Sequence, residues 1–456
     1  MNYLKFTFLA AVSVGLFSCS SNENKGEALL FNGKDLTGWK QMGGEAVYTV
    51  EDGTIVGTTI SGTPNSFLTT EKMYGDFVLE LEVMLPDTVT NSGIQFRSNY
   101  NPQANDGKGR VQGYQYELDP AARAWTGGIY DEGRRGWLYP LDLNPTAQTA
   151  FKHGEFNKVR IECIGNTIKT WLNDIPASFL VDTADATGFI ALQVHSISDQ
   201  QTPGTRIVWK NISIQTENIQ PTPFPADIHI VNRLDNRLTA EEEKNGWKLL
   251  FDGKTNNGWK SSKGDEFPAK GWVIENGEIS VVPNMGVKEN KGGDIITKDT
   301  YSAFDVSFDF RLTNAANSGF KYFVYTPEGT ESVVGLEYQV LDDENHPDAK
   351  NGIAGNRTLA SLYDLIPAQK PKRAVKPVGE WNTARIIAYP DNKVVHFLNG
   401  EKVLSFERGS EAFRKLVAGS KFRDFKGFGE VTAGPLMIQD HDDKVYYKNI
   451  RIRTLK

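Results

Sequence analysis

The chain repeats itself, and this repeat constrains its fold more than any other feature. The segment LLFNGKDLTGWK at residues 29–40 returns as LLFDGKTNNGWK at 249–260, and NSGIQFRSNY at 91–100 returns as NSGFKYFVYT at 317–326. Further matches follow in the same order along both halves. A chain of 456 residues is also too long for one ordinary hydrophobic core. The sequence therefore predicts two homologous domains in tandem.

Prolines and charged residues mark the boundary between the two repeats. Three prolines stand in QPTPFP at 220–225, and the charged stretch LTAEEEKNG at 238–246 favours a short helix. The expected division of the chain is a lipoprotein signal peptide at 1–18, a tether at 19–26, a first domain at 27–217, a linker at 218–244 and a second domain at 245–456.

The N-terminus resembles a bacterial lipoprotein signal. Lys5 precedes the apolar run Phe6–Phe17, which is too short to span a bilayer as a stable helix. The run ends in LFSC, and a polar stretch follows Cys19. We expect lipidated Cys19 to anchor the protein in the cell envelope of a Gram-negative bacterium, in the periplasm or at the outer-membrane surface; an ordinary secretory signal is the alternative. Cys163 is then unpaired, so the chain has no disulfide framework.

Composition and periodicity favour an all-β fold. Short runs rich in Val, Ile, Phe and Tyr recur between Gly, Asn and Asp clusters, and long stretches with a helical period are rare. Asn-Gly and Asp-Gly pairs in EDGT, ENGE and LNGE are typical of hairpin turns. This spacing predicts antiparallel β-sandwiches of the jelly-roll type. The net charge of −7, without a Lys/Arg block, does not support a nucleic-acid partner.

Hydrogen-bonding side chains gather on one face of three expected strands in each repeat, because side chains alternate faces along a strand. In the first domain they are Gln95 with Arg97, Gln115 with Glu117, and Gln193 with His195. Their counterparts in the second domain are Lys321, Glu337 with Gln339, and Gln439 with His441. Amides, carboxylates, a cation and an imidazole suit a concave sugar-binding surface, which needs both donors and acceptors. A solvated face without a ligand is the alternative, but the recurrence in both halves favours a site.

Loops supply further candidates. The segment 342–380 is unusually long, and loops of this length commonly have a function. It carries Arg357 and Tyr363, which we expect to reach a substrate. The shorter counterpart in the first domain, TGGIYDEGRRGWLYP, carries Tyr130.

Trp39 and Trp259 follow the opening segment of each repeat. They could serve as sugar-stacking platforms, but no fixed motif marks such a platform. We expect both to be core residues that close their sandwiches.

The motifs taken together resemble a known family. LLFDGK with GW, NSGF, GLEYQVLDDENHPDA, LYDL, GEWN, LNGEKV and MIQDHDDKVYYKNIRI look like the 3-keto-disaccharide hydrolase domain, formerly a domain of unknown function. The resemblance covers nearly all of the expected mature chain, twice over. It implies a fold similar to concanavalin A-like lectins and glucanases. The second domain matches the fuller pattern, whereas the first has LQVHSISDQ where the family pattern is nearer LQDHG.

The resemblance implies cleavage of 3-keto-glucosides, sugars already oxidised at C3 by a separate dehydrogenase. A ketone at C3 acidifies the C2 proton, so a base can form an enolate that expels the C1 oxygen. Hydration of the resulting 3-keto-2-hydroxyglucal completes a net hydrolysis. Such a site needs a base, an acid and an electrophile for the enolate. His441 is a candidate base or acid because its ordinary pKa lies near neutral pH.

The remaining roles are expectations of the same kind. Glu337 is the second acid–base candidate, and Lys321 or a divalent metal would stabilise the enolate. Asp342, Asp343 and Asp440 are candidate metal ligands, although their spacing is not diagnostic. The expected substrate-binding residues are Gln439, Gln339, Tyr363, Arg357 and Asp342. The matched candidates in the first domain are His195, Gln193, Glu117, Arg97, Gln95 and Tyr130.

Three other functions compete with this one. A direct β-glucanase needs paired carboxylates, but Glu117 and Asp119 lack the last Glu of an ExDxxE strand, and Glu337 lacks the Asp. A peptidase or esterase is poorly supported because no G-x-S-x-G elbow is present. A non-catalytic cell-surface glycan-binding lipoprotein explains the polar face equally well, because fold alone does not separate it from an enzyme.

Overall fold

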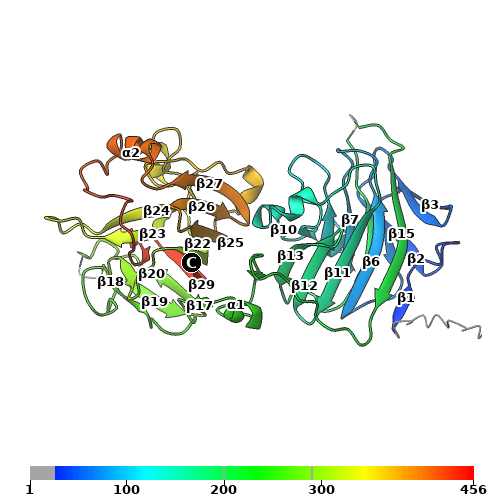
Figure 1. The fold of residues 1–456 in the computed structure, drawn as a ribbon, viewed down its shortest axis with the longest axis horizontal. Coiled ribbons are helices and arrows are strands. Elements are labelled where there is room, and N and C mark those ends of the chain that lie inside the picture. The colour runs from blue at the N-terminus through cyan, green and yellow to red at the C-terminus, as the bar shows by residue number, and fades with distance from the viewer. Residues whose placement is uncertain (1–25, 199–200, 289–290) are drawn as a thin grey trace, which may run out of the picture.

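The computed structural model describes residues 26–198, 201–288 and 291–456. It shows two β-sandwich domains side by side, joined by a linker that runs between them (Figure 1). The expectation of an all-β fold with two antiparallel sandwiches is confirmed. Cys19 lies outside the described residues, whereas Cys163 is buried in the first domain.

The first domain packs a nine-stranded sheet against a seven-stranded sheet. The larger sheet contains β1 (Glu27–Leu29), β3 (Val47–Glu51), β4 (Thr54–Thr58), β6 (Phe77–Met84), β11 (Asn157–Ile164), β12 (Thr167–Leu172), β13 (Ile175–Val181), β15 (Arg206–Gln215) and β16 (Val231–Asn232). The smaller contains β2 (Trp39–Gly43), β5 (Ser66–Thr70), β7 (Ser92–Asn101), β8 (Arg110–Leu118), β9 (Ile129–Glu132), β10 (Gly136–Tyr139) and β14 (Phe189–Val194). The chain crosses repeatedly from one sheet to the other, as in a jelly roll.

The second domain repeats this plan with an eight-stranded and a five-stranded sheet. The larger sheet contains β17 (Trp247–Leu249), β19 (Trp272–Glu275), β20 (Glu278–Val281), β22 (Phe304–Leu312), β25 (Trp381–Ala388), β26 (Lys393–Leu398), β27 (Glu401–Glu407) and β29 (Val445–Thr454). The smaller contains β18 (Trp259–Ser261), β21 (Ile295–Thr297), β23 (Asn317–Tyr325), β24 (Val334–Leu341) and β28 (Met437–Ile438). Helix α2 (Glu411–Ala418) follows β27.

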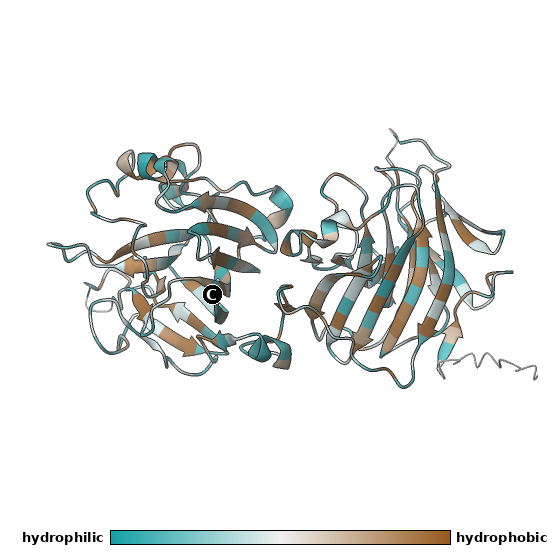
Figure 2. Cartoon of the chain, viewed as in Figure 1, coloured by the Kyte–Doolittle hydropathy of each residue, from teal (hydrophilic) through white to brown (hydrophobic). Residues whose placement is uncertain are grey.

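Each core lies between the two sheets of its domain. Hydrophobic and polar residues alternate along the long strands (Figure 2), so one face of each sheet turns inward. In the second domain Phe308 of β22 stacks on Phe320 of β23, with ring centroids 4.2 Å apart. This contact joins the two sheets at the centre of the sandwich.

Trp39 and Trp259 are core residues, as expected. Both are buried, and each indole N–H donates to a backbone carbonyl nine residues earlier in the chain. Trp39 donates to Leu30 at 2.8 Å, and Trp259 donates to Leu250 at 2.6 Å. The same bond therefore closes the opening loop of both domains.

The expected Asn-Gly and Asp-Gly hairpins are confirmed. Both central residues of each turn have positive φ, as a type I′ turn requires. The pairs are Asp52 (46°) with Gly53 (75°), Asn276 (53°) with Gly277 (79°), and Asn399 (49°) with Gly400 (84°).

The linker, residues 218–244, runs as a defined segment between the two domains and is called the strap below. Its expected helix is α1 (Ala240–Lys244), which begins with a capping box between Thr239 and Glu242. Just before this helix, the backbone N–H of Asn236 donates to the side chain of Asn449 on β29, and the backbone N–H of Asn449 donates to the side chain of Asn236. These paired bonds fix the strap to the second domain.

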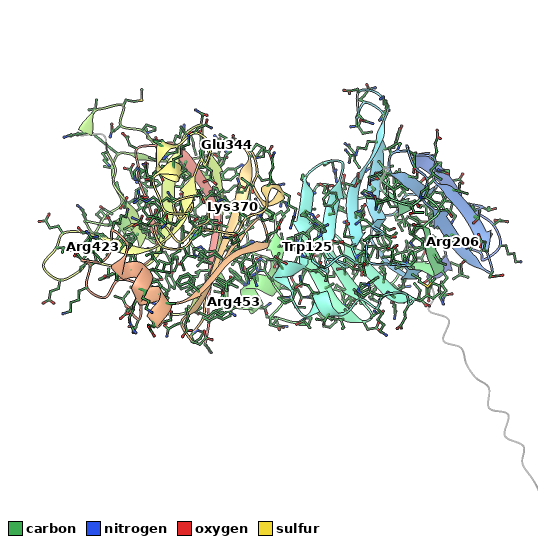
Figure 3. All side chains as sticks on the ribbon, turned by 90° about the horizontal axis from the view of Figure 1, so that it is seen from above. Trp125, Arg206, Glu344, Lys370, Arg423 and Arg453 are labelled. Carbon is green, nitrogen blue, oxygen red and sulfur yellow. The ribbon has the colours of Figure 1, made fainter. Side chains whose placement is uncertain are left out.

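Apolar and polar contacts also join the two domains directly. Ile387, Val395 and Phe397 of the second domain belong to the same apolar cluster as the core of the first. Arg373 lies over the ring of Trp125, 5.2 Å from its centroid, and Figure 3 shows Trp125 at the junction. The interface is therefore continuous with one hydrophobic core.

Within the described parts of the chain, no helix is long and apolar enough to cross a bilayer.

Replacing Trp259 with phenylalanine is expected to lower the free energy of unfolding of the second domain by about 1 to 3 kcal/mol. The Leu250 carbonyl loses its indole donor, and the smaller ring leaves space in the core. Calorimetry of wild type and W259F measures the change, and W39F is the matched variant in the first domain. Unchanged unfolding in both variants would show that the indole bonds do not close the sandwiches.

Candidate functional site

A pocket lies over the five-stranded sheet of the second domain. Most of the polar residues expected there line it. The lining residues are Asn317, Lys321, Val334, Gly335, Glu337, Gln339, Tyr363, Lys421, Phe422, Gln439 and His441. The structure thus brings together residues that stand more than 100 positions apart in the sequence.

Lys321 and Glu337 form the charged centre of this pocket. They lie directly opposite each other on β23 and β24, and Lys321 Nζ is 3.5 Å from Glu337 Oε2. Both side chains are largely buried. Directly paired residues on an antiparallel ladder face the same side of the sheet, so the register itself places the ammonium beside the carboxylate.

Gly319 makes room for Glu337, and this constraint explains the NSG motif. A Cβ at residue 319 would lie 2.3 Å from Glu337 Oε1, closer than any real contact. In the first domain a Cβ at the matching Gly93 would meet the Gln115 side chain at 2.4 Å. In both sandwiches the glycine therefore lets a polar side chain lie across the neighbouring strand.

Ser318, the middle residue of the motif, fixes the segment that carries Gln439. The Ser318 hydroxyl donates to the Gln439 carbonyl at 2.8 Å, and the Gln439 N–H donates to the Gly319 carbonyl at 3.0 Å. Oriented with its nitrogen toward them, the Gln339 amide donates to Glu337 Oε1 and to the Ser318 carbonyl, each at 3.0 Å. The Gln339 amide therefore bonds directly to the Glu337 carboxylate.

Gln439 and His441 both reach the pocket, although the strand that precedes them is shorter than the alternating pattern indicated. Strand β28 ends at Ile438, and the last strand is β29. Ile438 is buried in the core, Gln439 is half-buried, and His441 is exposed. The imidazole therefore lies on the solvent-exposed side of the pocket.

Tyr363 lines the pocket, and Arg357 holds it there. The Tyr363 hydroxyl donates to Asp348 at 2.8 Å, and the guanidinium of Arg357 lies 5.4 Å from the ring centroid. Arg357 also pairs with Asp348 and Asp364. Burial and the bond to Asp348 raise the pKa of Tyr363, so the phenol stays protonated. Arg357 itself is not among the lining residues.

Lys421, Phe422 and Asn317 line the pocket but were not among the expected site residues. Lys421 Nζ lies 4.1 Å from the centroid of the Tyr363 ring. Burial lowers the pKa of Lys421, and the charge of Glu337 opposes this effect. The loop after α2 gives no periodic signal from which Lys421 could have been predicted.

The three expected metal ligands hold loops instead of converging. Asp342 accepts from the N–H groups of Ala315, Glu344 and Asn345. Burial raises the pKa of Asp342, but these hydrogen bonds outweigh burial, so the pKa is lowered. Asp343 pairs with Lys370, and Asp440 accepts from Gly293. Among residues 26–198, 201–288 and 291–456, no group of three or more His, Cys, Asp or Glu is poised to hold a metal. The donor set does not fit a divalent cation.

The matching face of the first domain is closed. Gln115 donates to Glu117 at 2.7 Å, Asn91 donates to Glu117 at 2.7 Å, and Gln95 donates to Gln115. The register places Gln115 opposite Gln95, where the second domain has Glu337 opposite Lys321. Burial raises the pKa of Glu117 to about 7, and Asp119 adds to this effect while the two amides oppose it. An amide thus stands where the second domain has its cation.

Gln193, His195 and Tyr130 stand near this closed network without forming a comparable pocket lining. Gln193 is fully buried, and within the described residues its amide atoms have no hydrogen-bond partner. Its face of β14 also carries Phe189, which packs in a small apolar cluster. His195 is half-buried, with Nδ1 2.7 Å from the Ser196 carbonyl. Tyr130 pairs with Gln115 across β8 and β9.

Arg97 does not share a face with Gln95, contrary to the alternating pattern. A bulge between Phe96 and Asn99 interrupts the register, and Arg97 has a φ of 46°. Its buried guanidinium bonds to the Gly75 and Gly165 carbonyls and to Asp76. A β-bulge places two residues opposite one, which redirects the following side chain. Arg97 is therefore a structural residue beside the larger sheet.

Comparison with known proteins gives one family. The model of the 3-keto-alpha-glucoside-1,2-lyase-like domain matches residues 26–215 and again residues 246–453. The chain belongs to this family. The expected resemblance is confirmed, and both sandwiches carry the family pattern. Membership supports a glycosidase-type enzyme.

One curated relative and two solved structures are similar to parts of the chain. A "3-keto-disaccharide hydrolase" of Bacteroides thetaiotaomicron is 37% identical over 240 residues, which are 48% of this chain and 81% of that protein. A crystal structure from Parabacteroides distasonis, described as a "putative glycosyl hydrolase", is 35% identical and covers 49% of this chain and 100% of its own, with a TM-score of 0.43. A second from the same organism is 26% identical, covers 46% and 99%, and has a TM-score of 0.35.

Replacing Glu117 with glutamine is expected to stabilise the protein at alkaline pH and to leave it unchanged at acid pH. The pKa of Glu117 rises from its ordinary 4.5 to about 7 on folding, so the folded chain binds more protons between these values. Stability from this group is therefore complete below pH 4.5 and is lost as the pH rises through 7. The gain in E117Q at pH 8 should reach at most about 3 kcal/mol.

Thermal unfolding of wild type and E117Q across this pH range makes the comparison. Identical pH profiles for the two proteins would contradict the raised pKa.

Proposed function

We propose that the second domain cleaves 3-keto-glucosides, including 3-keto-disaccharides, by elimination across C1 and C2 followed by hydration. Family membership and the relative from Bacteroides thetaiotaomicron support this substrate class. The composition of the pocket supports the elimination.

The observation that carries the proposal is the single carboxylate of the pocket. Among its lining residues, Glu337 is the one carboxylate, beside two lysines and one imidazole. Most enzymes that hydrolyse unmodified glycosides use a pair of carboxylates on opposite sides of the bond. An elimination needs one base, one acid and cations for the enolate oxygen. The lining of this pocket matches the groups that an elimination needs and lacks the second carboxylate of a direct hydrolysis.

Glu337 is assigned as the base. Its carboxylate takes the C2 proton, and the C2–H electron pair forms the enolate with the C3 oxygen. Lys321, 3.5 Å from Glu337, and Lys421 are assigned to stabilise the negative charge on that oxygen. Two ammonium groups in a partly buried pocket supply this stabilisation without a metal ion.

His441 is assigned as the acid. When the enolate collapses, the C1–C2 double bond forms, the C1–O bond breaks, and the imidazolium gives its proton to the departing oxygen. The exposed position of His441 suits this role, because the leaving group must depart toward solvent. The same imidazole then activates the water that adds to C1, while Glu337 returns a proton to C2.

Gln439, Gln339 and Tyr363 are assigned to orient the sugar hydroxyls. Arg357 acts through Tyr363, and Asp342 acts by holding the loop that follows β24. The first domain is assigned a non-catalytic role because its matched network has an amide in place of the lysine and is buried.

The cellular setting is also proposed. Lipidation of Cys19 would place the enzyme in the cell envelope of a Gram-negative bacterium, and a sugar 3-dehydrogenase would supply its oxidised substrate. Radiolabelled lipid incorporation into wild type but not C19A tests the anchor.

Purified protein is expected to release 3-keto-glucose or 3-keto-2-hydroxyglucal from a 3-keto-glucoside and to leave the unoxidised glucoside intact. Glu337→Gln and Lys321→Met should each lower kcat at least about 100-fold, because each removes a group that acts in the transition state. Chromatography of the products measures turnover. Gln115→Met and His195→Ala are the matched controls in the first domain.

Three outcomes would contradict the assignment. Loss of turnover in His195→Ala with full activity in His441→Ala would move the reaction to the first domain. Equal cleavage of oxidised and unoxidised glucosides would contradict the elimination mechanism, which needs the C3 ketone. Binding of the 3-keto-glucoside without turnover would establish a glycan-binding module instead.

A further inference from the structure

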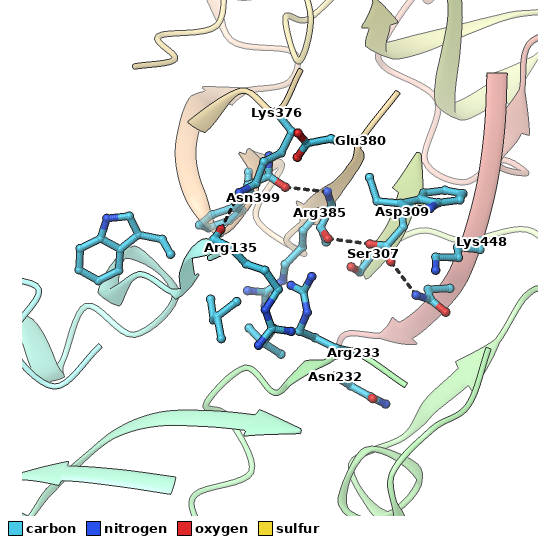
Figure 4. A pocket seen from close by; sticks show the side chains of 18 of the residues that line it. Arg135, Asn232, Arg233, Ser307, Asp309, Lys376, Glu380, Arg385, Asn399 and Lys448 are labelled. Carbon is cyan, nitrogen blue, oxygen red and sulfur yellow. Dashed lines mark hydrogen bonds between the residues drawn. The ribbon is translucent and has the colours of Figure 1, made fainter. Parts of the chain in front are cut away.

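A second and larger pocket lies between the two domains, away from the residues assigned to catalysis. Its volume is about 520 Å³, within the range of small-molecule sites. Arg134 and Arg135 line it from the first domain, His229 and Arg233 from the linker strap, and Lys376 from the second domain. Figure 4 shows Arg135, Arg233 and Lys376 around this space. All three parts of the chain therefore build one site.

Two cationic side chains in this pocket have donor capacity that the protein does not use. Lys376 Nζ donates to the Arg135 carbonyl at 2.8 Å, but it forms no ion pair within the described residues. Arg135 pairs with Asp131 and Asp182 through two of its nitrogens, whereas its buried Nη2 has no partner among the residues described. Burial, together with the charges of Arg233 and Arg135, lowers the pKa of Lys376, although Glu380 opposes this.

Two deeply buried side chains of the same lining have unpartnered nitrogens. Arg451 is 4% exposed and His229 is 7% exposed. Across the described chain, neither Arg451 Nε nor His229 Nδ1 has a hydrogen-bond partner. Buried polar atoms in folded proteins are almost always paired, so such atoms in a pocket point to a ligand.

The local potential also favours a negative group. Burial and the guanidiniums of Arg385, Arg451 and Arg453 lower the pKa of His229, so the imidazole is neutral near pH 7. Those arginines are paired on their other sides, for example Arg385 with Asp305 and Arg451 with Glu242. The lining as a whole carries seven cationic side chains and three carboxylates, so positive charge is in excess. The cations are Arg134, Arg135, Arg233, Lys376, Arg385, Lys448 and Arg451, and the carboxylates are Asp235, Asp309 and Glu380.

We infer that the interdomain pocket binds a small molecule that carries an oxyanion, held by Lys376, Arg135 and Arg233. A sugar acid fits the volume and the donors, and a free inorganic oxyanion satisfies the same donors. Charge-assisted hydrogen bonds from ammonium and guanidinium groups are the strongest that such a ligand can accept. Because strap and both domains contribute, the bound ligand also stabilises their mutual arrangement.

Isothermal titration of the full chain with glucuronate, inorganic phosphate and glucose tests this inference. Glucuronate is expected to bind saturably, and glucose is not. Lys376→Met should weaken binding at least about tenfold, because one charge-assisted bond is lost. Lys415→Met, which removes an exposed lysine on α2, is the matched control and should bind as wild type does.

Further arms make the result decisive. If phosphate alone binds, and does so through Lys376, the ligand is a free oxyanion and the site stands. Arg233→Gln provides a second variant in case the Lys376→Met protein does not fold. The Arg233 side chain is 40% exposed, so the Arg233→Gln protein is expected to fold. His441→Ala should bind glucuronate normally, which separates this site from the catalytic pocket. No saturable binding, or binding unaffected by both variants, would overturn the inference.

Discussion

The contact between Lys321 and Glu337 is the interaction on which the site depends. A buried carboxylate and a buried ammonium 3.5 Å apart stabilise each other's charged forms, whereas either alone would be costly in the same place. Their proximity is set by the antiparallel register of β23 and β24 and by the missing side chain of Gly319. Backbone geometry therefore fixes the chemistry of the pocket before any substrate arrives.

The first domain shows what the same scaffold does without that pair. Gln95 and Gln115 stand in place of Lys321 and Glu337. The polar side chains of this face are buried and hydrogen-bond to one another. The remaining carboxylate, Glu117, lies two residues along β8 from Gln115 and forms no salt bridge among the described residues. Burial therefore raises its pKa, although Arg123 opposes this effect. One fold thus holds an open charged pocket and a closed neutral network.

Much of this arrangement follows from sequence, because local rules set it. Strand alternation placed Glu337 and Gln339 on one face, and turn chemistry located the hairpins. Gln439 and His441 also line the pocket, but they lie beyond the end of β28. The alternation rule placed Arg97 on the wrong face, because a β-bulge interrupts β7 and has no reliable sequence signature. Lys421 lies in an irregular loop, and only tertiary packing brings it to Tyr363. The interdomain pocket depends on how two domains and a strap meet, which no single-strand pattern encodes.

The central claim is that the substrate loses its C2 proton before the glycosidic bond breaks. Turnover of a 3-keto-glucoside in deuterated water, with immediate borohydride reduction of the product, measures this by proton NMR at C2. Product incubated without enzyme corrects for spontaneous exchange. The account predicts one solvent deuterium at C2 of each 3-keto-glucose released by wild type. Retention of the original hydrogen at C2, together with equal turnover of substrates that carry hydrogen or deuterium at C2, would contradict the elimination and assign a direct hydrolysis to the pocket.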